Sequence, residues 1–376
     1  MTIRAKISLA FALLSLLGTS AFADIVIATV GPLKGQYAAF GEQLRQGVSR
    51  AVADINLSGG VNGEQLVLEV ADDACDPKQA MAVANQLVAK GVKFVAGHYC
   101  SGSSIAAAKI YEDAGILMIS PSSTNPKFTD EGGWNVHRVC GRDDAQGAFA
   151  GRAIAKAYAG KSIAILDDSS VYGIGLATEF KSALNGAGVT EKVRESYKPG
   201  ANDYNDLVQK LLTANVEVIY IGGYAFEAGT IIRQMRDFAS PAVLVGADAL
   251  LVDQFWSTSG TSGDGTLATF APDAQKLNAA KALTEAFKAA GYNPEGYTLH
   301  AYAAVQAFAQ AATATRSVDG RVLSTWLRAG NALNTVLGVL TLDSRGDVKE
   351  PQFAWYKWSQ GTYAEARPFP ETASTP

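Results

Sequence analysis

The chain has little of what catalytic and metal-binding chemistry usually requires. Its 376 residues include only three histidines and three cysteines. None of His98, His137 and His300 has a Cys, His or Asp partner at ligand spacing, so each is interpreted as structural and no metal is expected. The sequence contains no Walker-type Gly-x4-Gly-Lys-Ser/Thr, no Gly-x-Gly-x-x-Gly after its first strand, no His-Glu-x-x-His and no Gly-x-Ser-x-Gly. Neither an enzyme nor a bound cofactor is therefore expected.

Long apolar runs are also scarce. The run at 7–17 is shorter than the roughly 20 residues that a membrane-spanning helix needs. Arg4 and Lys6 precede it and Ala21-Phe22-Ala23 follows it, which is the pattern of a secretory signal peptide cleaved after Ala23. No cysteine follows the cut, so no lipid anchor is expected. The sequence thus predicts a leader at 1–23 and an exported protein that is free of the membrane.

Positive charge is in slight deficit. The chain carries 32 basic and 36 acidic residues, and loss of Arg4 and Lys6 leaves 30 against 36, a net charge of −6. A mildly acidic surface argues against nucleic acid and anionic membranes as partners. The remaining chain of about 350 residues exceeds what one hydrophobic core usually supports, so two domains are expected.

Three cysteines in an exported protein suggest one disulfide and one spare thiol. Cys75 and Cys100 each follow a predicted strand, and Cys140 is the odd one. His98 beside Cys100 could instead suggest a thiol nucleophile with its base. An oxidised Cys100 is the favoured interpretation, because the leader indicates export.

Strand and helix signals alternate along most of the chain, which predicts parallel sheets with right-handed crossovers. The apolar face of the first helix carries Phe40, Leu44 and Val48. Strands are predicted at 25–30, 65–70, 92–96, 117–119, 162–166, 216–221 and 242–245, the last clear one before two short tail strands at 339–342 and 352–358. Helices are predicted at 40–55, 78–90, 104–114, 145–159, 175–187, 204–213, 227–238, 274–290 and 297–313. We therefore expect two doubly wound α/β sheets that bind ligand at the carboxyl ends of their strands.

Hydroxyl, aromatic and acidic residues follow several of these strands. Ser101 to Ser104 open a helix, and Ser122, Ser123 and Thr124 follow the next strand. A helix N-terminus holds a carboxylate well, although simple N-capping by Ser or Thr explains the same spacing. Tyr224 and Asp248 follow two strands of the second series. Asp248 could pair with an ammonium group or be a solvated loop residue.

Several motifs in this sequence resemble the bacterial leucine/isoleucine/valine-binding proteins. The resemblance runs over essentially the whole mature chain. Its most specific stretch is Asp72-Asp73-Ala74-Cys75-Asp76-Pro77-Lys78-Gln79-Ala80. Further matches are Gly97-His98 with Cys100-Ser101, Ile110 to Asp113 with Gly115 to Ile119, Gly222-Gly223-Tyr224, and Thr298 to Ala304. The resemblance implies a type I periplasmic binding fold, with two lobes joined by a three-segment hinge and discontinuous domains at 24–142 plus 273–348 and at 143–272 plus 349–376.

The resemblance also implies a function and a site. It implies a monomeric periplasmic protein that traps a small amino acid between its lobes and delivers it to the permease of an ABC importer at the inner membrane. It further implies a disulfide between Cys75 and Cys100, with Cys140 free. The residues implied for binding the ligand are Ser101, Ser122, Thr124, Tyr224, Asp248, Tyr99, Tyr172, Tyr297 and Phe40.

Three departures from the family bear on specificity. Tyr99 stands where leucine binders usually have an aliphatic residue, Tyr297 stands in place of a phenylalanine, and Asp248 in place of a glutamate. We therefore hypothesise a ligand smaller or more polar than leucine, such as alanine, proline or 4-aminobutyrate. A branched-chain ligand remains open, because Tyr rings can swing aside. The alternative function is a ligand sensor of the same fold, either a receptor or an amide-responsive regulator.

Overall fold

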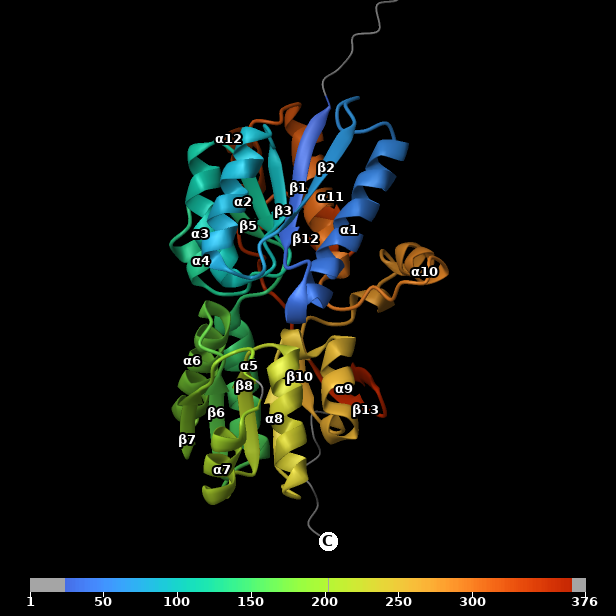
Figure 1. Cartoon of the computed structure of the whole chain (residues 1–376). Helices are drawn as coiled ribbons and strands as arrows, with labels where there is room; N and C mark the ends of the chain where they lie inside the picture. Colours follow the sequence, from blue (N-terminus) through green and yellow to red (C-terminus); the bar gives the residue numbers. More distant parts are fainter. Residues whose placement is uncertain (1–23, 202, 367–376) are drawn as a thin grey trace, which may run out of the picture.

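Two lobes stack end to end in the computed structural model, each a sheet covered by helices (Figure 1). The structure describes residues 24–201 and 203–366, so the predicted leader at 1–23 and its cleavage site lie outside the described residues. The predicted two-lobed α/β architecture is confirmed.

The first lobe is built on a five-stranded, fully parallel sheet of order β2-β1-β3-β4-β5. Its strands are β1 (Ile25–Gly31), β2 (Leu66–Asp72), β3 (Phe94–Gly97), β4 (Leu117–Ser120) and β5 (Val136–Arg138). The helices of this part of the chain are η1 (Gly35–Tyr37), α1 (Ala38–Leu57), α2 (Pro77–Ala89), α3 (Ser101–Asp113) and α4 (Lys127–Asp130).

The first strand shows why this sheet is buried on both faces. Ile25 and Ile27 join one hydrophobic core, whereas Ala28 and Val30 join another. Successive side chains of a strand point to opposite faces, so a continuous apolar run requires cover on both sides. The predicted apolar face of α1 is buried, as expected of an amphipathic helix that packs on the sheet.

The second lobe is built on a seven-stranded sheet of order β14-β13-β10-β9-β8-β6-β7. Strands β6 to β10 run parallel, whereas β13 and β14 are antiparallel additions at one edge. The strands are β6 (Ile163–Asp167), β7 (Val193–Ser196), β8 (Val218–Gly222), β9 (Val243–Gly246), β10 (Leu267–Phe270), β13 (Ala354–Ser359) and β14 (Thr362–Glu365). The helices are α5 (Asp143–Ala157), α6 (Val171–Gly186), α7 (Asn205–Thr213), α8 (Ala225–Asp237), η2 (Asp248–Leu250), α9 (Asp253–Ser259) and η3 (Gly260–Gly263).

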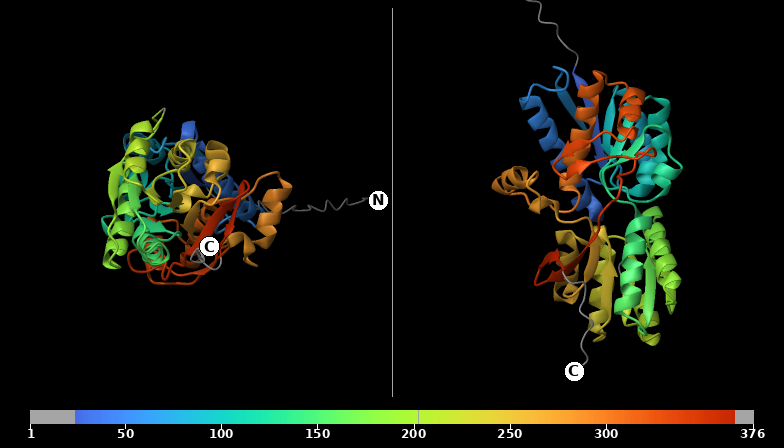
Figure 2. Two further views of the ribbon diagram at one scale, coloured as in Figure 1. Left: turned by 90° about the horizontal axis from the view of Figure 1, so that it is seen from below. Right: turned by 180° about the vertical axis from the view of Figure 1, so that it is seen from behind.

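The chain passes between the lobes three times, after β5, after β10 and before β13 (Figure 2, right). The segment between the second and third passages returns to the first lobe, where its longest helix packs on α1. Its elements are η4 (Ala274–Lys276), α10 (Lys281–Ala289), α11 (Thr298–Thr315), α12 (Gly320–Arg328), β11 (Leu333–Thr335) and β12 (Gly338–Leu340). Each lobe is therefore assembled from segments far apart in the sequence.

A buried ion network ties the first passage to the third. Arg138 Nε lies 2.7 Å from Asp347 Oδ1, and Arg142 Nη1 lies 2.9 Å from Asp347 Oδ2. Arg142 also binds Asp130 and Asp144. A buried carboxylate that loses its partners costs about 3–5 kcal/mol, so the network holds the base of the hinge together.

Some predicted elements were wrong. The predicted helix at 274–290 is broken, because Leu277 is extended and α10 starts at Lys281. The strand at 242–245 is not the last of the parallel series, since β10 follows it. β10 is only four residues long, so its apolar pattern is weak. It is stable as a strand because β9 and β13 hydrogen-bond to it on either side.

Candidate ligand site

The loops at the carboxyl ends of both sheets face one another between the lobes. All nine predicted ligand residues are buried there: Phe40, Tyr99, Ser101, Ser122, Thr124, Tyr172, Tyr224, Asp248 and Tyr297. They come from both lobes, so their burial means that the lobes are closed on one another. The geometry thus brings the predicted residues to one region, whereas their roles remain to be tested.

Aromatic rings form a continuous wall across this interface. The ring centroids of Phe40 and Tyr99 are 5.0 Å apart, and those of Phe40 and Tyr224 are 5.4 Å apart. Tyr224 contacts Tyr172 at 5.2 Å, and Tyr99 contacts Tyr297 at 5.8 Å. Contacts of this kind are favourable beyond the area they bury. Since Phe40, Tyr99 and Tyr297 lie in the first lobe and Tyr172 and Tyr224 in the second, the wall requires closure.

Asp248 is held between the lobes by three donors. The Tyr297 hydroxyl donates to Oδ2 at 2.8 Å, and the Tyr172 hydroxyl donates to Oδ1 at 3.0 Å. Gln146 Nε2 approaches Oδ1 at 3.4 Å. Burial raises the pKa of Asp248 to about 6, although these hydrogen bonds oppose the rise. The solvated-loop interpretation is therefore wrong, because the side chain is buried and hydrogen-bonded.

The N-terminus of α3 faces this region without a side-chain cap. Its N-cap residue is Cys100, whose side chain makes no capping hydrogen bond. The first amides of any helix lack intrahelical acceptors, and the 13-residue length of α3 supplies a positive dipole end. N-capping by a serine, the simpler explanation of the sequence, does not occur here. The free amides of this largely buried first turn can therefore receive an anion.

The predicted hydroxyl residues differ in what they bind. The Ser122 hydroxyl donates to the Tyr99 carbonyl at 3.0 Å, and the Ser101 hydroxyl accepts from Asn125 N at 3.3 Å. The Thr124 hydroxyl is buried and lacks a hydrogen-bond partner among the described residues. Buried hydroxyls are nearly always bonded. Thr124 is thus the hydroxyl most available to a ligand.

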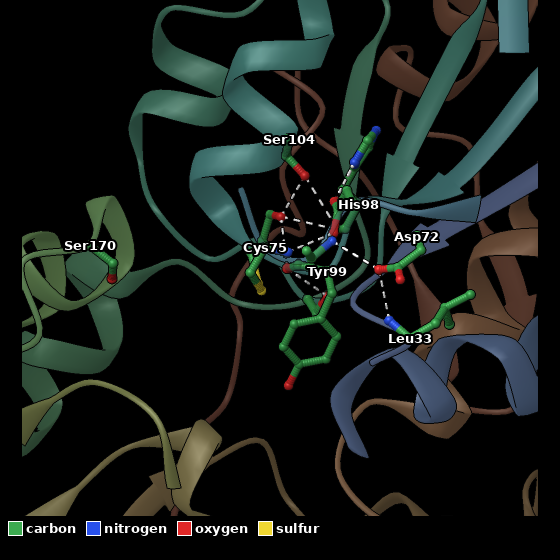
Figure 3. The surroundings of a disulfide bond; sticks show 12 residues. Leu33, Asp72, Cys75, His98, Tyr99, Ser104 and Ser170 are labelled. Carbon is green, nitrogen blue, oxygen red and sulfur yellow. Dashed lines mark hydrogen bonds and ion pairs between the residues drawn. A yellow bond between two sulfur atoms is a disulfide. The ribbon is translucent and has the colours of Figure 1, made fainter. Parts of the chain in front are cut away.

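A disulfide fixes the start of α3. Cys75 and Cys100 are bonded, with Cα atoms 5.5 Å apart, and Cys140 is free and buried. The predicted pairing is confirmed. Tyr99, the residue before Cys100, projects its ring away from the first lobe toward the second, where Ser170 begins α6 (Figure 3). The covalent link therefore positions both the helix N-terminus and the aromatic wall.

The three histidines are structural. His98 lies under the disulfide loop, where its ring nitrogens bind Asp73 at 2.6 Å and Tyr111 at 2.9 Å. Burial lowers the pKa of His137 to about 3 and that of His300 to about 4, so both are neutral at ordinary pH. Within 24–201 and 203–366 no cluster of three or more His, Cys, Asp or Glu side chains could hold a metal ion.

Sequence reasoning missed residues that join the lobes. Gln36 in η1 donates to Glu227 in α8 at 2.9 Å, and Gln254 in α9 donates to the Gln36 carbonyl at 2.6 Å. Within the second lobe, Gln146 of α5 reaches Asp248 and the Thr269 carbonyl. Glutamines within helical patterns carry no local signal of such contacts. They were identifiable only once the two lobes were placed.

Comparison with known proteins decides the family. The model of the periplasmic binding protein family matches residues 24–362. The chain is 42% identical to Leu/Ile/Val-binding protein homolog 1 of Brucella suis, over 92% of this chain and 93% of the relative. It belongs to the periplasmic binding protein family. Homolog 2 of Brucella abortus is 43% identical over 93% of this chain and 94% of its own length. An amino acid binding protein of Pseudomonas aeruginosa is 42% identical over 94% and 96%.

Solved structures of the same architecture confirm the type I fold. A leucine binding protein from Thermotoga maritima superposes with a TM-score of 0.85 at 24% identity, over 91% of this chain and 97% of the other. A Desulfitobacterium hafniense ABC transporter substrate-binding protein in complex with Leu gives a TM-score of 0.75 at 27% identity, over 91% and 100%. Among the described residues of this family member, the helices are too short or too polar to cross a membrane.

Proposed function

We propose that the chain is the periplasmic solute-binding component of an ABC amino-acid transport system. The observation that carries this proposal is the pairing of an uncapped helix N-terminus in one lobe with a buried, hydrogen-bonded Asp248 in the other. The first suits a carboxylate and the second an ammonium group. The naming of its relatives as Leu/Ile/Val-binding protein homologs supports an amino-acid ligand.

In this proposal the two lobes divide the zwitterion between them. The ligand carboxylate lies at the first turn of α3, with hydrogen bonds from Ser101, Ser122 and Thr124. The ammonium group lies against Asp248, and Tyr224 closes the site from the second lobe. An ion pair out of water is tolerable when each charge is also hydrogen-bonded. Sealing the pair requires both lobes, so closure is coupled to binding.

The side-chain end of the site determines the ligand class. Phe40, Tyr99 and Tyr297 crowd this end, and the Tyr297 hydroxyl is held by Asp248. That hydrogen bond restrains the ring from swinging aside to admit a bulky side chain. We therefore favour alanine, proline or 4-aminobutyrate, with leucine, isoleucine and valine as the competing class.

A thermal-shift screen of the mature protein against the amino acids and 4-aminobutyrate tests the function. A ligand that binds only the folded state adds about 4 kcal/mol of stability at a thousandfold excess over Kd. We expect one group of amino acids to raise Tm strongly. The shift should vanish in Asp248→Ala and persist in the exposed helix variant Asp237→Ala. No shift with any amino acid would overturn the proposal.

Location and partners complete the proposal. The leader predicted at 1–23 would deliver the protein to the periplasm, with cleavage after Ala23, and the partner would be the permease of an inner-membrane importer. The bounds of the two discontinuous lobes are proposed at 24–142 plus 273–348 and at 143–272 plus 349–376. Mass spectrometry of the secreted chain checks the cleavage, since an N-terminus other than Asp24 would correct it.

A further inference from the structure

A second carboxylate lies beside Asp248, on the first passage between the lobes. Asp143 is the first residue of α5 and is completely buried. Its backbone N–H donates to the Thr124 carbonyl at 2.9 Å. Gln146, three residues later on the same helix face, reaches Asp248. The first turn of α5 is therefore tied to Thr124 by its backbone and contacts Asp248 through Gln146.

Several polar atoms in this small region lack hydrogen-bond partners among the described residues. Within the described part of the chain, no hydrogen bond of 3.5 Å or less reaches the carboxylate oxygens of Asp143 or the hydroxyls of Thr124 and Tyr220. All three side chains are buried. Native proteins leave few buried polar atoms unpaired, because each costs about 1–3 kcal/mol. Unpaired atoms on three different elements, β8, α5 and the loop after β4, point to a polar group that belongs among them.

The charges around Asp143 are mostly negative. Burial raises the pKa of Asp143 well above its usual range, and repulsion from Asp248 adds to the rise. Thr124 and Arg138 oppose it, whereas the neighbouring Asp144 reinforces it. The Arg138 guanidinium is already occupied by Asp347 and by backbone carbonyls.

The remaining titratable neighbours are neutral. Burial raises the pKa of Tyr172, Tyr220 and Cys140, so none of them adds a formal charge at ordinary pH. Among the described residues, these two buried carboxylates thus lack a free cation of their own. Their mutual repulsion favours the protonated form of at least one of them until a cation arrives.

The number of acceptor positions on Asp248 limits how many hydrogen bonds it can accept from the ligand. A carboxylate offers about four acceptor positions, and Tyr172, Gln146 and Tyr297 already occupy three of them. An ammonium group brings three N–H donors, so Asp248 cannot accept them all. Asp143 has free acceptors for the remaining N–H groups, and the Thr124 hydroxyl can accept from the ammonium while it donates to the ligand's carboxylate.

We propose that Asp143 is a second anionic contact for the ligand's ammonium group, beside Asp248 and Thr124, and that ligand capture expels a proton from this pair of carboxyl groups. This inference rests on the proposed function, because it assumes an ammonium-bearing ligand. The proton leaves to solvent as the ammonium charge takes its place. Binding that releases a proton becomes tighter as pH rises, up to tenfold per unit for one proton.

Titration calorimetry measures how many protons are released when the ligand binds. The probe is whichever of L-leucine, L-alanine, L-proline and 4-aminobutyrate gives the largest thermal shift. Titrations at pH 6 in phosphate and in a buffer of large ionisation enthalpy give the number of protons released from the difference in observed heat. We expect between one half and one proton for the native chain, and a Kd that falls severalfold between pH 5 and pH 7.

Two variants separate a ligand contact from a structural role. Asp143→Asn keeps the shape of the side chain and should weaken binding about tenfold at pH 7, with proton release reduced to the part that Asp248 contributes. Asp237→Asn changes an exposed carboxylate at the end of α8 and should leave both quantities unchanged. The native chain's proton count needs no variant, so it stands even if Asp143→Asn fails to fold.

The outcomes are distinct. Tight binding without proton release overturns this inference and leaves the proposed function intact. Proton release that persists unchanged in Asp143→Asn overturns the role of Asp143. If none of the four probes and none of the other amino acids binds the native chain, both the proposed function and this inference are overturned.

Discussion

The two ends of the candidate site treat charge in opposite ways. At the α3 end the groups are neutral, since a helix N-terminus and three hydroxyls face the cleft. At the η2 end they are acidic, with Asp248 and Asp143 buried together. Backbone dipoles can be buried without a counterion, whereas a buried carboxylate raises its own pKa and waits for a cation. The neutral end therefore depends on the residues that position it, whereas the acidic end depends on a bound cation to balance its charge.

The largest expected effect comes from removing the acid. Asp248→Ala should weaken amino-acid binding at least a hundredfold, because it leaves the ligand's ammonium group buried without its main counter-charge. Calorimetry or thermal shift with the preferred amino acid measures this loss. Asp237→Ala on the exposed face of α8 is the control. Binding that survives Asp248→Ala within fivefold would remove Asp248 from the site.

Asp248 should also lower the stability of the unliganded protein. Because burial raises the pKa of Asp248 to about 6, the folded state binds more protons than the unfolded state between about pH 4 and pH 6. Its ionised carboxylate therefore destabilises the fold above pH 6. Asp248→Asn should raise the free energy of unfolding at pH 7 by about 1–3 kcal/mol while abolishing tight binding. Denaturant unfolding without ligand checks the sign, and a loss of stability would contradict it.

Ligand binding at the neutral end should depend on the disulfide that supports it. Cys75→Ser with Cys100→Ser removes the bond that fixes the start of α3, and should cost about 2–4 kcal/mol of stability. Ligand affinity should fall as well, because the helix N-terminus and Tyr99 lose their support. Urea unfolding and calorimetry on the double variant test this. Cys140→Ser is the control, and equal losses there would show that the disulfide is not the cause.

Within the neutral end, the free hydroxyl should matter more than the bonded one. Thr124→Val should weaken binding about tenfold, since it removes a hydroxyl that has no partner in the described chain. Ser122→Ala should cost less, because that hydroxyl donates to the Tyr99 carbonyl. Parallel titrations of the two variants give the order. The reverse order would mean that Ser122 turns to the ligand.

The smallest effect should come from the aromatic bridge between the ends. Tyr297→Phe removes a hydrogen bond that lowers the pKa of Asp248. The pKa of Asp248 should then rise further, so that the weakening of binding on acidification begins at a higher pH. At pH 7 the affinity should fall only about two- to fivefold. A pH series of Kd for Tyr297→Phe and the native chain measures the displacement, and superimposable profiles would refute it.

The sequence supported prediction of the fold where local pattern and tertiary structure agree. The apolar run at 25–30 and the helical spacing from Phe40 to Val48 became β1 and α1. Prediction failed where an element is stabilised by its neighbours. β10 is a strand because β9 and β13 flank it, and the half-exposed edge strand β7 carries Arg194 and Glu195, which leave little apolar signal.

The site divides in the same way. Sequence motifs alone placed Ser101, Thr124, Tyr224 and Asp248 after strands, and the family resemblance added Tyr172. Gln36, Gln146 and Asp143 were not found, because a glutamine or aspartate in a loop or on a helix looks like solvated surface. Their contacts join positions up to 191 residues apart.

The sequence by itself determined the alternation of strands and helices, the disulfide candidates and the polar residues that follow the strands, since these depend on neighbours along the chain. Tertiary structure alone decided that Asp248 is buried, that α3 is left uncapped, and that Asp143 has no cation of its own among the described residues. Desolvation and charge proximity are properties of a closed space between lobes, and no local pattern of residues can encode them.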